Sequence, residues 1–262
     1  MVTPARSQLW AVFCQTNTMP NTIYWTLVDS NQTPPETRGI LSPSELEKFS
    51  TFRFPKRRDE WLLGRWTAKA LAHSLPAYQL YRLEQIEILT TPQGAPYIQV
   101  PGKITPADCL TISHSEHLAL CALTPGSDLH VGADLEKIEP RTETFILDYF
   151  TPAECLIVEA YSVEIRAVVV TLIWSAKEAM LKALRVGLRW DTRMVEVRSM
   201  DGLLQPGDAK GEWQRLEIGE LKSNNRAWSA WWLRHDQFVL TLAGFAATQA
   251  DIQSAHLVEK KL

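Results

Sequence analysis

The sequence lacks the marks of several protein classes. Its four cysteines contain no C-x-x-C pair, so neither a zinc ribbon nor a disulfide framework is indicated, and a reducing compartment suits them. The longest apolar run, residues 167–174, is far shorter than the roughly twenty residues that cross a bilayer. The apolar stretch at residues 9–14 is too short for a secretory signal. We therefore expect a cytoplasmic protein without a membrane segment.

An excess of charge of one sign is also absent. The chain of 262 residues has 27 Lys and Arg against 30 Asp and Glu, a formal net charge of −3. General nucleic-acid binders carry a strong basic excess, so we expect no nucleic-acid partner. Hydrophobic residues make up 45% and charged residues 22%, which is ordinary for a globular protein and unlike a disordered chain.

Helical and strand-like segments alternate along the chain. Ser42, Pro43 and Glu45 predict the start of a helix, and residues 56–74 predict a second helix with a cationic start. Helical texture returns over residues 144–184. Strands are predicted at residues 97–100, 110–113, 118–123 and 130–136, near 195 and 216, and at 228–233 and 238–245. The repeated order of helices and then strands indicates an α+β fold of two units, residues 1–125 and 126–262.

Three carboxylates are spaced so that they would meet. Asp134 and Glu136 lie two residues apart on a predicted strand and project from the same face. Trp174, Glu178 and Lys182, at four-residue spacing, share one face of a predicted helix. Such an acid set would suit Mg²⁺, and the lysine would suit a phosphate. The alternatives are a solvated strand end and a Glu–Lys pair on the surface.

Other polar residues fit phosphate binding or an ordinary structural role. Ser113 and His114 end a predicted strand, where they would contact a phosphate or form a local turn. Lys56 and Arg57 begin a cationic helix that would bind phosphate or face solvent. The T-P-A-E sequence that ends at Glu154 has the form of a capping box, a complete structural explanation for this acid. No G-x-S-x-G elbow occurs, which disfavours a serine hydrolase.

In combination and order, these segments resemble the Sfp-type 4′-phosphopantetheinyl transferases. The two signature segments of that family are matched by residues 132–136, G-A-D-L-E, and 174–182, W-S-A-K-E-A-M-L-K. Three supporting segments also occur in the family's order, at residues 62–65, 94–97 and 113–115. The resemblance implies two similar α/β halves related by a pseudo-twofold axis, with coenzyme A bound in the cleft between them.

The resemblance also implies a reaction. Phosphopantetheine would pass from coenzyme A to a serine hydroxyl of an apo acyl or peptidyl carrier protein, releasing adenosine 3′,5′-bisphosphate, as in a holo-[acyl-carrier-protein] synthase. The implied ligands of Mg²⁺, or of Mn²⁺ as the alternative ion, are Asp134, Glu136 and Glu178. The implied contacts to coenzyme A are Lys56, Arg57, Ser113, His114, Lys177 and Lys182. The implied catalytic residues are Glu178, Lys182 and Glu154, the last of which aligns with an acid proposed as general base.

Two departures from the family pattern bear on coenzyme A. Ala95 stands where many relatives have lysine, and Arg185 stands in a segment where relatives often show Gly-x-Gly. Arg185 would then replace the lost cation. Two other functions stay open for these acids. One is that of a magnesium-dependent phosphodiesterase or nuclease, and the other is that of a catalytically silent coenzyme A-binding relative. Because two fused halves already form a cleft, we expect a monomer.

Overall fold

The computed structural model describes residues 21–32, 37–102, 108–126, 128–200, 211–222 and 226–262. Its N-terminal half contains β1 (Thr22–Asp29), α1 (Pro43–Ser50), α2 (Pro55–His73), β2 (Glu87–Thr90), β3 (Pro96–Gln99), β4 (Cys109–Ser115) and β5 (Leu118–Thr124). The remainder contains β6 (His130–Lys137), α3 (Glu143–Tyr149), α4 (Pro152–Ala160), α5 (Val163–Ala183), β7 (Val195–Ser199), β8 (Gln214–Glu220), β9 (Ala227–His235), β10 (Phe238–Ala246), α6 (Gln249–Gln253) and β11 (His256–Glu259). Short 3-10 turns lie at Ser30–Gln32, Leu83–Gln85, Gly187–Arg189 and Thr192–Met194.

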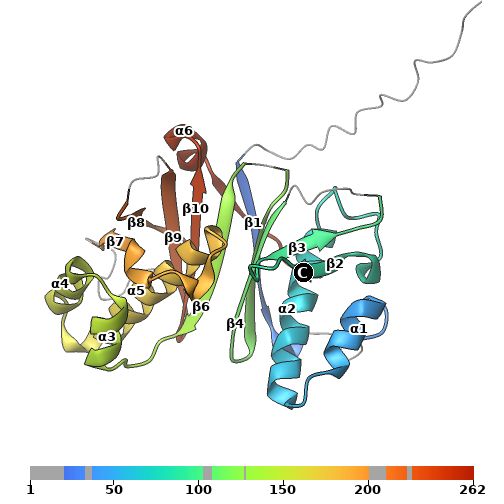
Figure 1. Cartoon of the computed structure of the whole chain (residues 1–262), viewed down its shortest axis with the longest axis horizontal. Coiled ribbons are helices and arrows are strands. Elements are labelled where there is room, and N and C mark those ends of the chain that lie inside the picture. The colour runs from blue at the N-terminus through green and yellow to red at the C-terminus, as the bar shows by residue number, and fades with distance from the viewer. Residues whose placement is uncertain (1–20, 33–36, 103–107, 127, 201–210, 223–225) are drawn as a thin grey trace, which may run out of the picture.

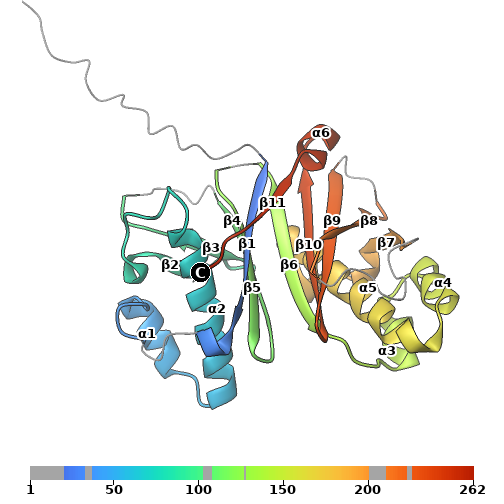
Figure 2. The ribbon, with the colours of Figure 1, turned by 180° about the vertical axis from the view of Figure 1, so that it is seen from behind.

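Two sheets lie in the middle of the molecule, and a long helix covers the outer side of each (Figures 1 and 2). The first sheet has the strand order β11-β1-β5-β4, and the second has β6-β10-β9-β8-β7. The strands β2 and β3 form a separate hairpin. Helix α2 packs on β5 and β1, whereas α5 packs on β6 and β10. The structure thus confirms the predicted α+β class.

The central strands are rich in apolar residues because both of their faces are covered. Every residue of β5 is buried, which is expected for a strand between a helix and a second sheet. Apolar residues from the two sheets pack together in one core between them. The members of this core include Ile23 and Trp25 of β1, Leu118 and Leu120 of β5, Val131 and Leu135 of β6, and Leu240 and Leu242 of β10.

The edge of the first sheet meets the edge of the second through side chains. The hydroxyls of Thr111 and Ser113 on β4 accept hydrogen bonds from the backbone N–H groups of Ala133 (3.0 Å) and Leu135 (3.3 Å) on β6. These side chains of β4 thus accept the hydrogen bonds that backbone carbonyls of a neighbouring strand would accept in a continuous sheet. This contact brings the polar end of β4 beside the acidic end of β6.

The order of elements in the first half returns in the second. In each half one strand is followed by helices, a pair of short strands, and two long strands, the second of which pairs antiparallel with the first strand of that half. The repeat agrees with the two similar halves that the family resemblance implies. The boundary between residues 125 and 126 stays a prediction, and the last strand, β11, pairs in parallel with β1.

Most predicted elements are present, and the exceptions are short or terminal. The helix starts at Ser42 and Thr151 are confirmed as capping boxes. The helical texture of residues 144–184 is confirmed as three helices, α3, α4 and α5. The strands β1, β2 and β11 and the helix α6 were not predicted. Among the described residues, no helix is long and apolar enough to span a bilayer.

The cysteines agree with the expectation of reduced thiols. Cys109, Cys121 and Cys155 are free, whereas Cys14 lies outside the described residues, as does the apolar stretch at residues 9–14.

Candidate active site

Strand β6 presents two acids to the same face, as predicted. Val131, Ala133 and Leu135 point into the core between the sheets, so Asp134 and Glu136 point toward α5. Asp134 is only 3% exposed, whereas Glu136 is half-buried. Two carboxylates therefore lie next to each other in a site that is poor in water.

Helix α5 supplies the opposing face. The ammonium of Lys182 lies 2.6 Å from Asp134 Oδ1, and the indole N–H of Trp174 donates to Glu136 Oε1 at 3.3 Å. Glu178 lies between them on the same face, because four residues make about one turn. Trp174 and Lys182 thus contact the strand acids directly, with Glu178 between them on the helix.

The close approach of α5 to β6 depends on Gly132. A Cβ built at this glycine would lie 1.9 Å from the carbonyl oxygen of Ala179 and 2.5 Å from the amide nitrogen of Ala183. Both are backbone atoms of α5, so they cannot move aside as the end of a side chain could. The absence of a side chain at Gly132 allows the helix to touch the strand, and this contact brings Glu178 and Lys182 within reach of Asp134.

The protonation of the acids reflects burial and mutual repulsion. Burial and the neighbouring charge of Asp134 raise the pKa of Glu136 to about 7. The same two causes raise the pKa of Glu178. Arg141, at 3.3 Å from Glu136 Oε2, opposes this rise. A further cation beside these acids would oppose both causes and favour their charged forms.

The oxygen donors suit a hard divalent cation. Asp134 Oδ2 and Glu178 Oε1 are buried without a hydrogen-bond partner in the described part of the chain, and unpaired buried acceptors are costly. In the described residues no three Asp, Glu, His or Cys side chains converge closely enough to hold a metal ion as they stand. The type of donor atom fits Mg²⁺, but the acids would have to move closer together to bind it. The ligand set of Asp134, Glu136 and Glu178 therefore stays a prediction.

The polar end of β4 reaches this site from the other half. The Ser113 hydroxyl donates to Asp134 Oδ1 at 3.0 Å and accepts from the Lys182 ammonium at 3.0 Å. His114 follows at the surface. Partial desolvation, together with the charges of Lys182 and Arg57, lowers the pKa of His114 against the opposing effect of Glu60. Residues of both halves therefore meet at one place.

The basic start of α2 lies at the rim of the same place. Arg57 is exposed and close enough to His114 to affect its pKa. Lys56 is more remote, since its side chain is 83% exposed and lies 3.9 Å from Glu60. The charge of Arg57 thus acts on the predicted site through His114, whereas the ion pair of Lys56 is with Glu60 of its own helix.

A cavity of about 160 Å³ opens beside Lys182 between the two halves. The residues that line it come from the β2–β3 turn, from β4 and from the end of α5: Gln93, Gly94, Ala95, Pro96, Cys109, Leu110, Thr111, Ile112, Lys182, Arg185 and Gly187. Ala95 and Arg185, the two departures from the family pattern, thus face one cavity. Arg185 has a left-handed backbone with φ 57°, a conformation more usual for glycine.

Two predicted site residues, Glu154 and Lys177, lie outside this site. Glu154 is fully buried, and its oxygens accept from the Thr151 and Val197 amides (2.8 and 2.9 Å) and from the Lys177 ammonium (2.6 Å). Lys177 is also fully buried and donates to the Val195 carbonyl at 2.8 Å. The predictions of Glu154 as general base and of Lys177 as a coenzyme A contact are therefore corrected, because neither side chain can reach a substrate.

Sequence reasoning missed two arginines and the partners of Trp174. Arg141 contacts Glu136 and stacks over Phe145 at 5.3 Å. Arg189, in the 3-10 turn after α5, donates to the Gln93 carbonyl at 2.8 Å and so attaches this turn to the cavity wall. No motif marks either arginine.

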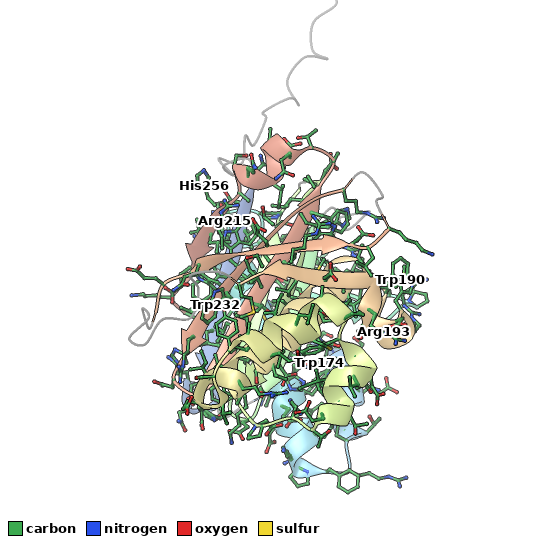
Figure 3. The ribbon with its side chains drawn as sticks, turned by 90° about the vertical axis from the view of Figure 1, so that its left-hand side faces the viewer. Trp174, Trp190, Arg193, Arg215, Trp232 and His256 are labelled. Atoms are coloured by element: carbon green, nitrogen blue, oxygen red, sulfur yellow. The ribbon has the colours of Figure 1, made fainter. Side chains whose placement is uncertain are left out.

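The ring of Trp174, labelled in Figure 3, packs at 5.0 Å from Phe145 and at 5.2 Å from Tyr149. The short spacing between Phe145 and Tyr149 on α3 is the one signal that could have predicted an aromatic group here.

The fold and the site define a protein in which acids and a lysine meet hydroxyl and imidazole groups at the junction of two similar halves. A sequence model described as the 4′-phosphopantetheinyl transferase superfamily matches residues 130–243. The 4′-phosphopantetheinyl transferase HetI of Nostoc sp. is 28% identical over 153 residues, which cover 57% of this chain and 62% of HetI. The part of the chain that matches this superfamily contains β6 and α5, and with them the three acids and the lysine of the site.

Two solved structures show partial similarity. A holo-(acyl-carrier-protein) synthase from Bacillus anthracis, in complex with CoA (3′,5′-ADP), covers 38% of this chain and 91% of its own length, at 19% identity and a TM-score of 0.34. The holo-[acyl-carrier-protein] synthase of Thermotoga maritima covers 51% of this chain and 76% of its own length, at 18% identity and a TM-score of 0.34.

Proposed function

We propose that this protein transfers 4′-phosphopantetheine from coenzyme A to a serine hydroxyl of an apo carrier protein. The observation that carries the proposal is the meeting of Asp134, Glu136, Glu178 and Lys182 with Ser113 at the junction of the two halves. The match of residues 130–243 to the superfamily supports the same reaction class. We further propose the holo-[acyl-carrier-protein] synthase type, active as a monomer in the cytoplasm.

A bound Mg²⁺ would polarise the phosphate oxygens and neutralise charge that develops as the pyrophosphate linkage breaks. Asp134, Glu136 and Glu178 would hold it, and two of their oxygens are unpartnered in the described residues. Asp134 is kept in place by the Ser113 hydroxyl and the Lys182 ammonium. Glu136 is oriented by the Trp174 indole.

The phosphates of coenzyme A would lie against the cationic side of the site. Lys182, which lies 2.6 Å from Asp134, would contact the pyrophosphate, while His114 supplies a neutral donor and Ser113 holds Asp134 and Lys182 in place. Arg57 at the rim adds positive charge. Arg185, which shares the adjoining cavity with Ala95, would supply the phosphate contact that the alanine cannot make.

The carrier's serine must lose a proton as its oxygen bonds to the phosphorus nearer pantetheine and adenosine 3′,5′-bisphosphate departs. Glu178 suits the role of acceptor because it is a carboxylate beside Asp134 at the place where the two halves meet, and a carboxylate within hydrogen-bond reach can take the proton of an attacking hydroxyl. With Glu154 buried in its helix cap, we assign the proton to Glu178, directly or through water.

Intact-mass spectrometry of an apo acyl carrier and an apo peptidyl carrier, incubated with the protein, coenzyme A and Mg²⁺, tests the proposal. We expect a mass gain equal to phosphopantetheine that disappears when EDTA is added. Cleavage of coenzyme A without labelling of the carrier would instead indicate a phosphodiesterase. Intact coenzyme A and unlabelled carriers would refute transferase activity toward these carriers.

A further inference from the structure

The first half of the molecule contains a second buried glutamate–lysine pair, far from the acids of the site. Glu45 is 3% exposed and Lys69 fully buried, and their side chains are in direct contact. Glu45 closes the capping box of α1 at Ser42 (3.0 Å) and accepts from the Ile88 amide of β2 at 3.1 Å. Lys69 also donates to the Ile40 carbonyl at 2.8 Å and to the Leu83 carbonyl, shortly before β2, at 3.1 Å.

The pair in the second half has the same arrangement. Glu154 closes the capping box of α4 at Thr151 and accepts from the Val197 amide of β7. Lys177, in the long helix, bonds both to Glu154 and to the Val195 carbonyl. In each half, therefore, a lysine of the long helix is fastened to the start of a shorter helix and to the chain at or near the next strand.

What differs between the halves is the rest of the long helix. Counted from the two lysines, Trp174 of α5 corresponds to Trp66 of α2, but Glu178 corresponds to Ala70. The first half thus keeps the buried pair without the acid next to it. In the first half, therefore, the buried pair has no catalytic acid beside it. Removing that pair is a control for removing the pair next to Glu178.

Lys177 immediately precedes Glu178, and consecutive residues are separated by about 100° around a helix. A lysine held on the side of α4 and β7 fixes the rotation of α5 about its axis, and this rotation sets the direction of Glu178. The contact at Gly132 sets how close the helix lies to β6, and Trp174 and Lys182 bond to the strand acids on the side that faces β6. The bonds of Lys177 attach the helix on another side, so they add a restraint on its rotation that the contacts to β6 do not supply.

We propose that Glu154 and Lys177 are positioning residues, which hold α5 in the rotation that directs Glu178 toward Asp134. They act through the helix and never touch the substrate. The inference rests on the proposed function, since it assigns the pair its effect on that reaction. It also assigns to Glu154 an importance for turnover that does not require it to accept a proton.

The test compares two matched double variants. Lys177→Met with Glu154→Gln removes the pair next to the site, and Lys69→Met with Glu45→Gln removes its counterpart. Replacing both members of a buried ion pair avoids leaving one charge alone in the core, which favours folding. Both variants are assayed well below their Tm for kcat, for the Mg²⁺ concentration that gives half of the maximal rate, and for the rise in Tm caused by coenzyme A with Mg²⁺.

We expect the variant of the second half to lose at least 30-fold in kcat and to need at least 10-fold more Mg²⁺. The control variant should stay within about 3-fold of the wild type in both quantities. The rise in Tm on adding coenzyme A and Mg²⁺ should shrink only in the variant of the second half. Equal effects in the two variants, after correction for the folded fraction, would overturn the proposal and leave both pairs with a purely structural role.

Two further arms separate the possible failures. If the double variant of the second half does not fold, Glu154→Gln alone, which keeps the Lys177 bond to Val195, should still lower kcat about 10-fold relative to Glu45→Gln, and equal activity would overturn the proposal. If the wild type labels no carrier, the proposed function fails, but the Tm rise with coenzyme A and Mg²⁺ still decides whether the pair positions the site.

Discussion

A single methyl group added at residue 132 should separate the two sides of the site. In Gly132→Ala the new Cβ would lie 1.9 Å from the Ala179 carbonyl oxygen, whereas non-bonded carbon contacts need well over 3 Å. Helix α5 must therefore move away from β6 by about 1 Å or more. Because the obstructing atoms are backbone, no change of rotamer can relieve the contact.

The size of the effect follows from this displacement. Overpacking of a core typically costs about 1–3 kcal/mol. Because the contact at Gly132 is severe, we expect the free energy of unfolding to fall by about 3 kcal/mol. For a chain of this size, that corresponds to a fall in Tm of about 6 °C or more. A shift of about 1 Å in a catalytic group can cost about 100-fold in rate, so kcat should fall by about that factor.

The experiment measures thermal unfolding and carrier labelling side by side. Gly64→Ala is the matched control, because its Cβ would meet only the Ile112 side chain, at 3.2 Å, and that methyl group can move. The control should keep most of its stability and at least about half of its kcat. Wild-type stability and activity in Gly132→Ala would refute the reasoning that direct contact of α5 with β6 brings the acids together.

Three further predictions follow from the same contacts. Asp134→Asn should lower kcat by about 100- to 1,000-fold in the carrier-labelling assay while shifting Tm by only a few degrees, and an active variant would remove Asp134 from the proposed site. In EDTA the free energy of unfolding should fall by at most about 3 kcal/mol as the pH rises from 4.5 to 7. In this range folded Glu136, with a pKa of about 7, keeps its proton, whereas a glutamate of the unfolded chain, with a pKa of 4.5, has lost it. Glu136→Gln should flatten that part of a denaturant-unfolding series, and an unchanged slope would contradict the raised pKa. His114→Ala should raise the KM for coenzyme A about 10-fold with a smaller change in kcat; an unchanged KM would place His114 outside the binding surface.

Much of the candidate site could be predicted because its spacing is local. Alternation along β6 placed Asp134 and Glu136 on one face, and four-residue spacing placed Glu178 and Lys182 on one face of α5. The capping box of Glu154 was predicted for the same reason, since its two hydrogen bonds join residues three apart. The family resemblance then supplied the reaction, which spacing alone did not.

Other parts of the site could not be predicted because they depend on contacts between distant residues. The bond between Ser113 and Asp134 exists only because β4 lies beside β6. The strand β11 is four residues long and pairs with β1 from the far end of the chain. Arg141 contacts Glu136 through a bend after β6 that carries no motif.

The case of Glu154 and Lys177 separates what the sequence determined from what the tertiary structure decided. The sequence by itself determined the local geometry, the helix cap at Glu154 and the helix that carries Lys177, because these depend on backbone hydrogen bonds between near neighbours. It also placed Lys177 directly beside Glu178. Only the packing of α4, α5 and β7 decided that Lys177 turns inward to Glu154 while Glu178 turns toward Asp134. The physical reason is that the burial of a charged side chain depends on which surfaces meet, and those surfaces come from residues far apart in the chain.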